Sequence, residues 1–280
     1  MNPGLARLQP YPFARLRTLL ADVEPRAGLA PIDLGIGEPR GAAPALVREA
    51  LVAALPGLSR YPATAGEPEL RGAIAGWLER RFTLAPGTLD PASQVLPVSG
   101  TREALFALAQ CFVSPQRPLV LMPNPGYQVY EGAALLAGGE PHYLPLQAAQ
   151  GYRPQLAGLE PALLDRTALL YLCSPGNPTG AVLDREELQH ILTLARRHGF
   201  IVAADECYSE IYADEAAPPP GLLEAAEALG AGLDQCVVLH SLSKRSGVPG
   251  LRSGFVAGAA DLIATFALYR SYHGLSLIHI

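Results

Sequence analysis

The sequence lacks charge blocks and long apolar runs. Its 280 residues include 21 Lys and Arg against 26 Asp and Glu, for a net charge of −5, and they form no basic cluster of the kind that binds nucleic acid. An uninterrupted run of about 18 apolar residues, the minimum for a membrane-spanning helix, does not occur. Residues 1–16 contain no apolar signal core, so we expect a cytoplasmic protein.

Cysteines are few and far apart, at positions 111, 173, 207 and 236. Because there is no C-x-x-C pair, the sequence favours neither a disulfide framework nor a zinc site. We therefore expect four reduced, buried thiols and no metal.

Apolar runs and amphipathic segments alternate along the chain. The predicted strands are residues 94–98, 118–122, 167–173, 200–205, 236–240 and 254–258. The predicted helices are residues 67–82, 101–112, 127–138 and 184–199, and residues 214–223 form a predicted surface loop. Continuous apolar strands between helices predict a three-layer α/β fold, with a mostly parallel sheet covered by helices on both faces.

Polar or glycine-rich segments follow five of the predicted strands. They are residues 99–101, 124–127, 174–180, Asp205 and residues 241–244. In open α/β sheets, ligands bind beyond the carboxyl ends of the strands. We therefore expect these five segments to share one pocket.

Two of these segments are consistent either with ligand binding or with an ordinary helix cap or turn. "VSGTREALF" (98–106) places Ser and Thr at a helix start, where free N–H groups can bind an anion; the same residues are also common helix N-caps. "CSPGNPTG" (173–180) is a rigid turn whose Asn177 amide can donate to a ligand oxygen. Pro, Gly and Asn are equally typical of an ordinary turn.

A carboxylate and a lysine are the other candidates. Asp205 ends an apolar strand, where a carboxylate is costly without a partner, which is either a protonated ring nitrogen or, as for most isolated aspartates, an arginine or a backbone cap. Tyr208 follows three residues later and either contacts the same ligand or packs. Lys244, in "SLSKRSGVPGLRSG" (241–254), follows an apolar strand among small hydroxyls. That setting suits a desolvated amine nucleophile, although most lysines are simply solvated. Arg252 suits phosphate binding or a surface ion pair.

Several of these motifs together resemble the class I and II aminotransferases, fold-type I enzymes that use pyridoxal 5′-phosphate. The matching segments are "YPATAGEPELRGAIA", "SGTREALF", "CSPGNPTGAV", "AADECYSEIY" and "SLSKRSGVPGLRSGF". They occur in the family's order between about residues 8 and 274. The resemblance implies the large cofactor-binding domain of that fold.

The resemblance also implies residue roles around the cofactor ring. Lys244 would bond covalently to the cofactor aldehyde and then move the substrate's α-proton. Asp205 would pair with the ring nitrogen, making the ring an effective electron sink. Asn177 and Tyr208 would hydrogen-bond the ring's 3′-oxygen, and Tyr127 would stack on the ring.

Further roles concern the phosphate, the substrate and a second subunit. The residues that would hold the phosphate are Gly100, Thr101, Ser241 and Arg252. Tyr61, in "RYPATAG", would reach the phosphate of a neighbouring copy, which implies a homodimer. Gly37, in "GIGEP", would lie beside the substrate carboxylate.

The implied reaction transfers an amino group from an amino acid to 2-oxoglutarate. The wording of "LQPYPFARLRTLL" and "LYRSYHG" is closest to the branch that acts on N-succinyl-L,L-diaminopimelate in lysine biosynthesis. Two alternatives stay open, because the pocket chooses the outcome of the cofactor's chemistry. They are another reaction on this scaffold, such as C–S bond cleavage, and a non-catalytic cofactor-binding fragment or regulatory module.

The resemblance also predicts how the chain is divided. Residues 1–45 would be an arm and the N-terminal part of a small domain, and residues 46–274 the large domain. The rest of the small domain, with the arginine that clamps the substrate carboxylate, would be absent through C-terminal truncation. Residues 275–280, "LSLIHI", would be a non-native tail.

Overall fold

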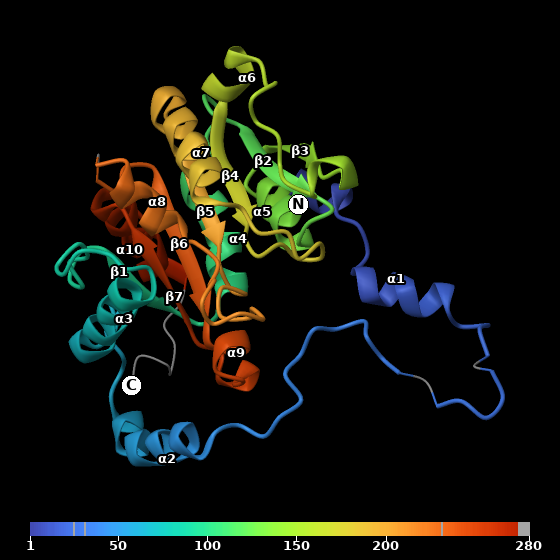
Figure 1. The fold of residues 1–280 in the computed structure, drawn as a ribbon, viewed down its shortest axis with the longest axis horizontal. Coiled ribbons are helices and arrows are strands. Elements are labelled where there is room, and N and C mark those ends of the chain that lie inside the picture. The colour runs from blue at the N-terminus through green and yellow to red at the C-terminus, as the bar shows by residue number, and fades with distance from the viewer. Residues whose placement is uncertain (25, 31, 231, 274–280) are drawn as a thin grey trace.

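The computed structural model describes residues 1–273, except residues 25, 31 and 231. The tail predicted at residues 275–280 therefore lies outside the described residues. The strands are β1 (Val95–Val98), β2 (Leu119–Asn124), β3 (Glu140–Pro145), β4 (Thr167–Cys173), β5 (Ile201–Asp205), β6 (Cys236–Ser241) and β7 (Gly254–Gly258). They form a single sheet in the order β1-β7-β6-β5-β4-β2-β3 (Figure 1).

Ten α-helices lie in the described part of the chain. They are α1 (Pro12–Leu19), α2 (Ala45–Ala54), α3 (Pro68–Arg81), α4 (Thr101–Phe112), α5 (Gln128–Leu136), α6 (Pro161–Asp165), α7 (Arg185–His198), α8 (Leu222–Ala228), α9 (Leu242–Arg245) and α10 (Ala260–His273). Short 3₁₀ turns occupy Pro3–Arg7, Leu55–Ser59, Ala148–Gln150 and Pro249–Leu251. None of the described helices is both long and apolar enough to cross a membrane.

The sheet is mostly parallel, as the sequence predicts. β7 alone runs against its neighbours, pairing antiparallel with both β1 and β6. Two successive reversals return β1 to the direction of β6, so the carboxyl ends of β1, β2, β4, β5 and β6 lie along the same edge of the sheet. The predicted segments therefore follow strands that end at one edge of the sheet, while the shared pocket itself stays a prediction.

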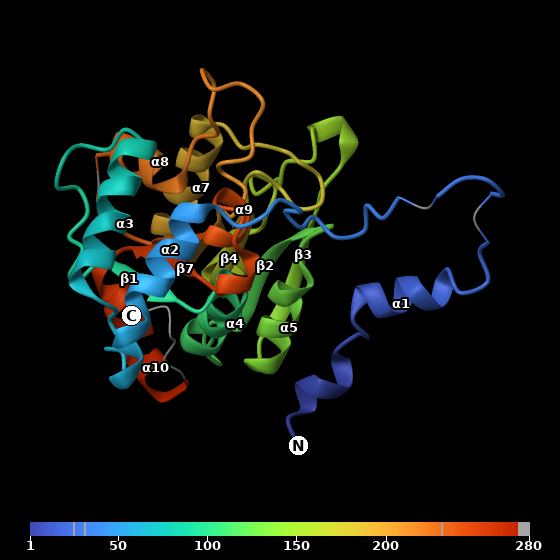
Figure 2. The ribbon, with the colours of Figure 1, turned by 90° about the horizontal axis from the view of Figure 1, so that it is seen from below.

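Alternation along the strands divides the core into two layers. Leu170, Val202 and Val238 face one cluster, which α3, α7 and α8 cover. Leu169 and Val237 face the other cluster, which α4, α5 and α10 cover. Figure 2 shows α7 and α8 on one side of the strands, with α4 and α5 on the other. The three-layer α/β prediction is confirmed.

Local sequence signals account for the ends of α7. The Asp184 carboxylate accepts from the Glu187 N–H at 2.9 Å, and the Glu187 carboxylate accepts from the Asp184 N–H at 2.8 Å. This is a reciprocal capping box. Gly199 ends the helix with φ 71°, a left-handed conformation that favours glycine.

Three local predictions need correction. β3 was not predicted, because this edge strand buries only Leu144 and therefore lacks a continuous apolar signal. Residues 214–223 are not wholly a surface loop, since Leu222 and Leu223 are fully buried at the start of α8. Residues 241–244 are not a plain loop, because α9 begins at Leu242 directly after β6.

The N-terminal segment packs differently from the sheet and its helices. Neither α1 nor α2 contains a buried residue, and in Figure 1 the chain around α1 extends away from the sheet. The buried core begins in α3, with Ile74 and Leu78. The division proposed at residue 45 stays a prediction.

Candidate active site

One glycine joins three of the predicted site segments. Gly254, the first residue of β7, pairs with Val98 at the end of β1 and with Ser241 at the end of β6. The turn before α4, the end of β6 and the residues preceding β7 therefore meet at one place. In this way the antiparallel strand brings Arg252 to the edge where the parallel strands end.

Gly100 and Arg252 are in direct contact. A Cβ atom on Gly100 would lie 2.3 Å from the Arg252 Nη2, and Gly100 has φ 94°, so only glycine fits the turn. Arg252 itself is held in a left-handed conformation, with φ 53°, and its Nη1 donates to the Pro249 carbonyl at 3.0 Å. The guanidinium is thereby fixed beside the start of α4.

The other predicted phosphate ligands, Thr101 and Ser241, also lie beside Gly254. Thr101 is the first residue of the twelve-residue helix α4, and its methyl group would lie 3.3 Å from a Cβ on Gly254. The Ser241 hydroxyl accepts from the Ser243 N–H at 3.1 Å at the start of α9. A helix N-terminus, two hydroxyls and an arginine together form a suitable site for a phosphate dianion.

Asp205 lies at the end of β5 and is 5% exposed. Its Oδ2 accepts from the Tyr130 hydroxyl at 2.8 Å, and its Oδ1 accepts from the Cys207 N–H at 3.3 Å. Burial raises the pKa of this carboxyl, while the bonds from Cys207 and Tyr130 and the nearby His240 oppose that rise. Within the described residues, Asp205 forms no ion pair with a lysine or arginine. A cationic ring nitrogen therefore suits it.

Tyr130 is the site residue that the sequence reasoning missed. It lies in α5, which the sequence predicted, but its phenol is 1% exposed and reaches across to β5. One signal was available, because an i, i+3 spacing places Tyr130 on the same helical face as the predicted ligand Tyr127. The two rings meet edge to face with centroids 5.7 Å apart.

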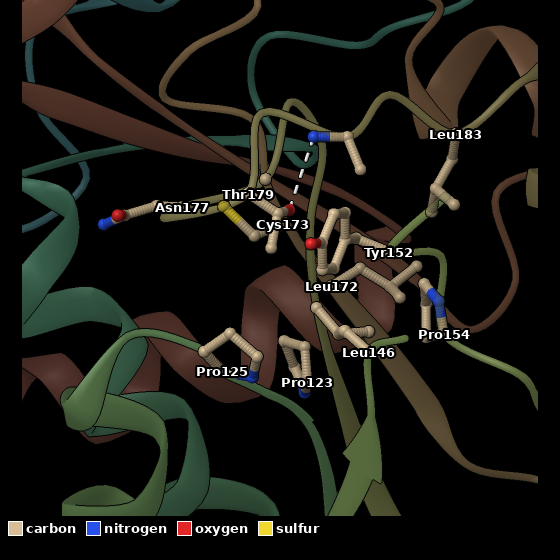
Figure 3. A pocket seen from close by; sticks show the side chains of 12 residues that line it. Pro123, Pro125, Leu146, Tyr152, Pro154, Leu172, Cys173, Asn177, Thr179 and Leu183 are labelled. Carbon is tan, nitrogen blue, oxygen red and sulfur yellow. Dashed lines mark hydrogen bonds between the residues drawn. The ribbon is translucent and has the colours of Figure 1, made fainter. Parts of the chain in front are cut away.

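Three predicted ring contacts come from loops around Asp205. The Tyr127 hydroxyl accepts from the Arg102 Nε at 2.5 Å, and burial raises the pKa of Tyr127. Tyr208 is half-buried; burial first and then the Asp205 carboxylate raise the pKa of its phenol. The Asn177 amide points away from a small proline-lined cavity (Figure 3). That cavity holds only about 20 Å³, room for about one water molecule.

Lys244 is half-buried in α9, three residues beyond the end of β6. Its Nζ donates to the backbone carbonyl of Gly37, another predicted site residue. Asp205, the last residue of β5, pairs with Leu239 in the β5–β6 ladder. Asp205 and Lys244, which lies just beyond the end of β6, are therefore at the same edge of the sheet. Tyr61 lies apart from these residues and is 96% exposed.

The four thiols are free, but only Cys236 is buried; the other three are partly exposed, which corrects the expectation. Cys207 Sγ lies 3.1 Å from the Thr101 hydroxyl. Burial raises the pKa of the Cys207 and Cys173 thiols, which favours their neutral form. Among the described residues, no group of three His, Cys, Asp or Glu side chains could hold a metal ion.

Comparison with known proteins decides the family. The family model for Aminotransferase class I and II matches residues 30–272. The chain belongs to this family. The cofactor of class I and II aminotransferases is pyridoxal phosphate, and the expectation of that family and cofactor is confirmed.

Two relatives of this aminotransferase chain share the name LL-diaminopimelate aminotransferase. The chain is 38% identical over 269 residues to the LL-diaminopimelate aminotransferase of Desulforudis audaxviator and 36% identical over 269 residues to that of Moorella thermoacetica. Both matches cover 95% of this chain and 66% of the relative. The chain thus spans just under two thirds of the length of these relatives.

Solved aminotransferases share the fold. An aminotransferase from Neisseria meningitidis is 45% identical with a TM-score of 0.93, covering 100% of this chain and 71% of that one. The aminotransferase AspB from Helicobacter pylori is 40% identical with a TM-score of 0.89, covering 97% of this chain and 70% of that one.

The site residues fit the cofactor of this aminotransferase family. Gly100 keeps open a turn that a Cβ would fill, beside the fixed Arg252 guanidinium. The Asp205 carboxylate is buried without a lysine or arginine partner in the described structure. A phosphate end and a cationic ring end are therefore both provided for at one edge of the sheet.

Proposed function

We propose that this protein is a pyridoxal-phosphate-dependent transaminase that moves an amino group between a diaminopimelate donor and 2-oxoglutarate. The observation that carries the proposal is the convergence at Gly254, which gathers Gly100, Thr101, Ser241 and Arg252 beside the edge where Asp205 and Lys244 follow their strands. No other residue set among the described ones joins an anion cradle, a buried carboxylate and an amine at one sheet edge.

Each residue contributes a separate task. Arg252 and the start of α4 bind and orient the phosphate. With the cofactor bound, Asp205 would hold a proton on the ring nitrogen, Tyr127 would pack on the ring, and Asn177 and Tyr208 would donate to its 3′-oxygen. When bound, the cofactor supplies an aldehyde for imine formation and a ring that stabilises negative charge on the substrate's α-carbon.

Lys244 performs the proton transfer. Its amine is positioned by α9 directly after β6 and serves as the covalent anchor for the cofactor. With the cofactor bound, the neutral Lys244 amine would remove the proton from the substrate's α-carbon. Lys244 donates to the Gly37 carbonyl, a contact that supports the predicted role of Gly37 beside the substrate carboxylate.

The donor is the finer part of the proposal. The names of the two relatives favour free LL-diaminopimelate, while the sequence resemblance favours the N-succinyl form. The two donors present the same α-amino acid group to Lys244 and differ at the distal amine, which is cationic in one and acylated in the other. A pocket that is complementary to one form will discriminate against the other through an unpaired polar group.

The test compares both donors with 2-oxoglutarate and measures glutamate. We expect glutamate from the N-succinyl donor at a higher kcat/KM than from free LL-diaminopimelate; the reverse order assigns the donor that the relatives' names carry. Release of ammonia or pyruvate without glutamate would instead assign elimination. Borohydride reduction tests the anchor separately: Lys244 is the chain's only lysine, so Lys244→Ala should abolish the trapped cofactor adduct, and a persisting adduct would move the covalent bond to the N-terminal amine.

A further inference from the structure

Neighbouring side chains in the core hold the Tyr130 ring in a fixed orientation. Its ring stacks on Tyr171, with centroids 4.6 Å apart and planes 13° apart. The Tyr171 hydroxyl in turn donates to the Leu105 carbonyl at 2.6 Å. Because both tyrosines are buried and interlocked between α5, β4 and α4, the Tyr130 phenol has one orientation, toward Asp205.

Each oxygen of Asp205 accepts one hydrogen bond from an O–H or N–H group, and the Cys207 thiol also hydrogen-bonds the carboxylate. Tyr130 donates to Oδ2 at 2.8 Å, and the Cys207 N–H donates to Oδ1 at 3.3 Å, which is longer and weaker. A carboxylate has about four lone-pair positions, so these two bonds leave others for a ring N–H. The Tyr130 bond is the shorter of the two and thus the main constraint on how the carboxylate turns.

We infer that Tyr130 is a positioning residue for cofactor binding, fixing the rotamer and ionised form of Asp205 through its phenol. This inference rests on the proposed function, because it concerns the residue that meets the ring nitrogen. The neutral alternative is that the phenol is merely satisfied by the nearest acceptor. If Tyr130 positions Asp205, removing its hydroxyl weakens cofactor binding. If the phenol is merely satisfied, removing it lowers only the stability of the fold.

Other groups around Asp205 do not replace this donor. The Cys207 thiol also hydrogen-bonds Asp205, but a neutral S–H is a weak donor compared with a phenol. Burial raises the pKa of the Cys173 thiol and of the Tyr208 phenol, and neither forms a hydrogen bond with Asp205 among the described contacts. Tyr127 is engaged by Arg102. His240 belongs to the opposite layer of the core, where its Nε2 lies 3.0 Å from Glu206 Oε2.

The experiment titrates the 280-residue chain, freed of cofactor, with pyridoxal phosphate and measures binding by absorbance. Tyr130→Phe should bind about tenfold more weakly, because Asp205 loses the shorter of its two hydrogen bonds from O–H and N–H groups. Tyr171→Phe is the matched control: it also removes a buried hydroxyl, but one that bonds the backbone, so its affinity should stay within about twofold of the unmodified chain. Thermal melting should show comparable losses of stability for both variants.

Two further measurements separate positioning from structure. In an Asp205→Asn background, Tyr130→Phe should cause no additional loss of affinity, because its effect passes through the carboxylate. The acid limb of the binding curve should move to higher pH in Tyr130→Phe, since the lost donor favoured ionised Asp205. If the variant folds poorly, 3-fluorotyrosine at position 130, a stronger donor of the same size, should move that limb to lower pH.

The outcomes distinguish this inference from the proposed function. Equal affinities for Tyr130→Phe and Tyr171→Phe, or additive losses in the Asp205→Asn background, would overturn the role of Tyr130 while leaving the enzyme assignment intact. Failure of the unmodified chain to form an adduct that depends on Lys244 would overturn the proposed function, and the inference with it.

Discussion

At the scale of single residues, the site contains groups that folding alone would not favour. Asp205 is buried without a basic partner among the described side chains, and Arg252 adopts a left-handed backbone conformation. Burial of a carboxylate costs free energy, and a non-glycine residue at positive φ is strained. Such costs are typical of binding sites, where a ligand supplies the missing partner.

Replacing Asp205 by Asn should stabilise the cofactor-free chain while weakening cofactor binding. Burial raises the folded-state pKa of Asp205 above its value of 3.8 in the unfolded chain. The folded state therefore binds its proton more tightly, and stability falls as pH rises through the folded pKa. Asp205→Asn should melt at a higher temperature at neutral pH, and the difference should narrow as pH falls. A difference in melting temperature that stays the same at all pH values would contradict the raised pKa of Asp205.

Gly100→Ala should weaken pyridoxal phosphate binding at least tenfold, because the added Cβ would displace the Arg252 guanidinium and strain a backbone at φ 94°. Equilibrium dialysis measures the loss. Gly87→Ala is a matched control, since φ there is also positive, at 81°, but a Cβ would meet nothing within 4 Å. Equal binding by both variants would remove Gly100 from the site.

At the scale of elements, buried polar pairs fix the connections behind the site. Glu206 follows Asp205 and faces the opposite layer, where it accepts from the Leu222 N–H at 2.7 Å and lies beside His240. Trp77 and Phe255 surround the imidazole, with centroids 5.2 Å away in each case. This pair joins the end of β5 to the start of α8 and to β6.

His240→Leu should lower the free energy of unfolding by about 3–5 kcal/mol, because it leaves Glu206 Oε2 buried beside an apolar side chain while only Oε1 keeps its partner, the Leu222 N–H. Urea denaturation measures the change. Arg166→Leu breaks the exposed pair with Glu140 and should cost less than about 1 kcal/mol. Similar losses for the two variants would show that Glu206 does not depend on His240.

Asp184→Ala should cost about 1 kcal/mol by removing the cap of α7. Asp234→Ala, which alters another exposed aspartate, should be near neutral in the same denaturation measurement. A loss as large at Asp234 as at Asp184 would mean that the capping box does not stabilise the helix.

At the scale of the whole molecule, the N-terminal segment exposes many apolar side chains. Leu34 is 87% exposed, Ile32 81% and Leu46 77%, and Tyr61 is also open. A monomer rarely leaves such a set uncovered. These side chains support the proposed homodimer, in which Tyr61 would reach the partner's phosphate.

Sedimentation should therefore give a mass near twice 29.5 kDa. Replacing Ile32 and Leu34 by Ser should shift the protein toward monomer, while Leu268→Ser, on α10 and also exposed, should not. A monomer at all concentrations for the unmodified chain would contradict the dimer and the role given to Tyr61.

The amino-acid sequence by itself determined the strands and helices with strong periodicity, as in α4 and α7, because a buried apolar run or face leaves a local pattern. It also determined the family, through motifs at strand ends. Only the tertiary structure decided that Tyr130 meets Asp205 and that Gly254 unites three segments. The Tyr130–Asp205 contact joins residues 75 positions apart, and the Gly254–Val98 pair joins residues more than a hundred positions apart. No local preference encodes which distant side chain fills a given space.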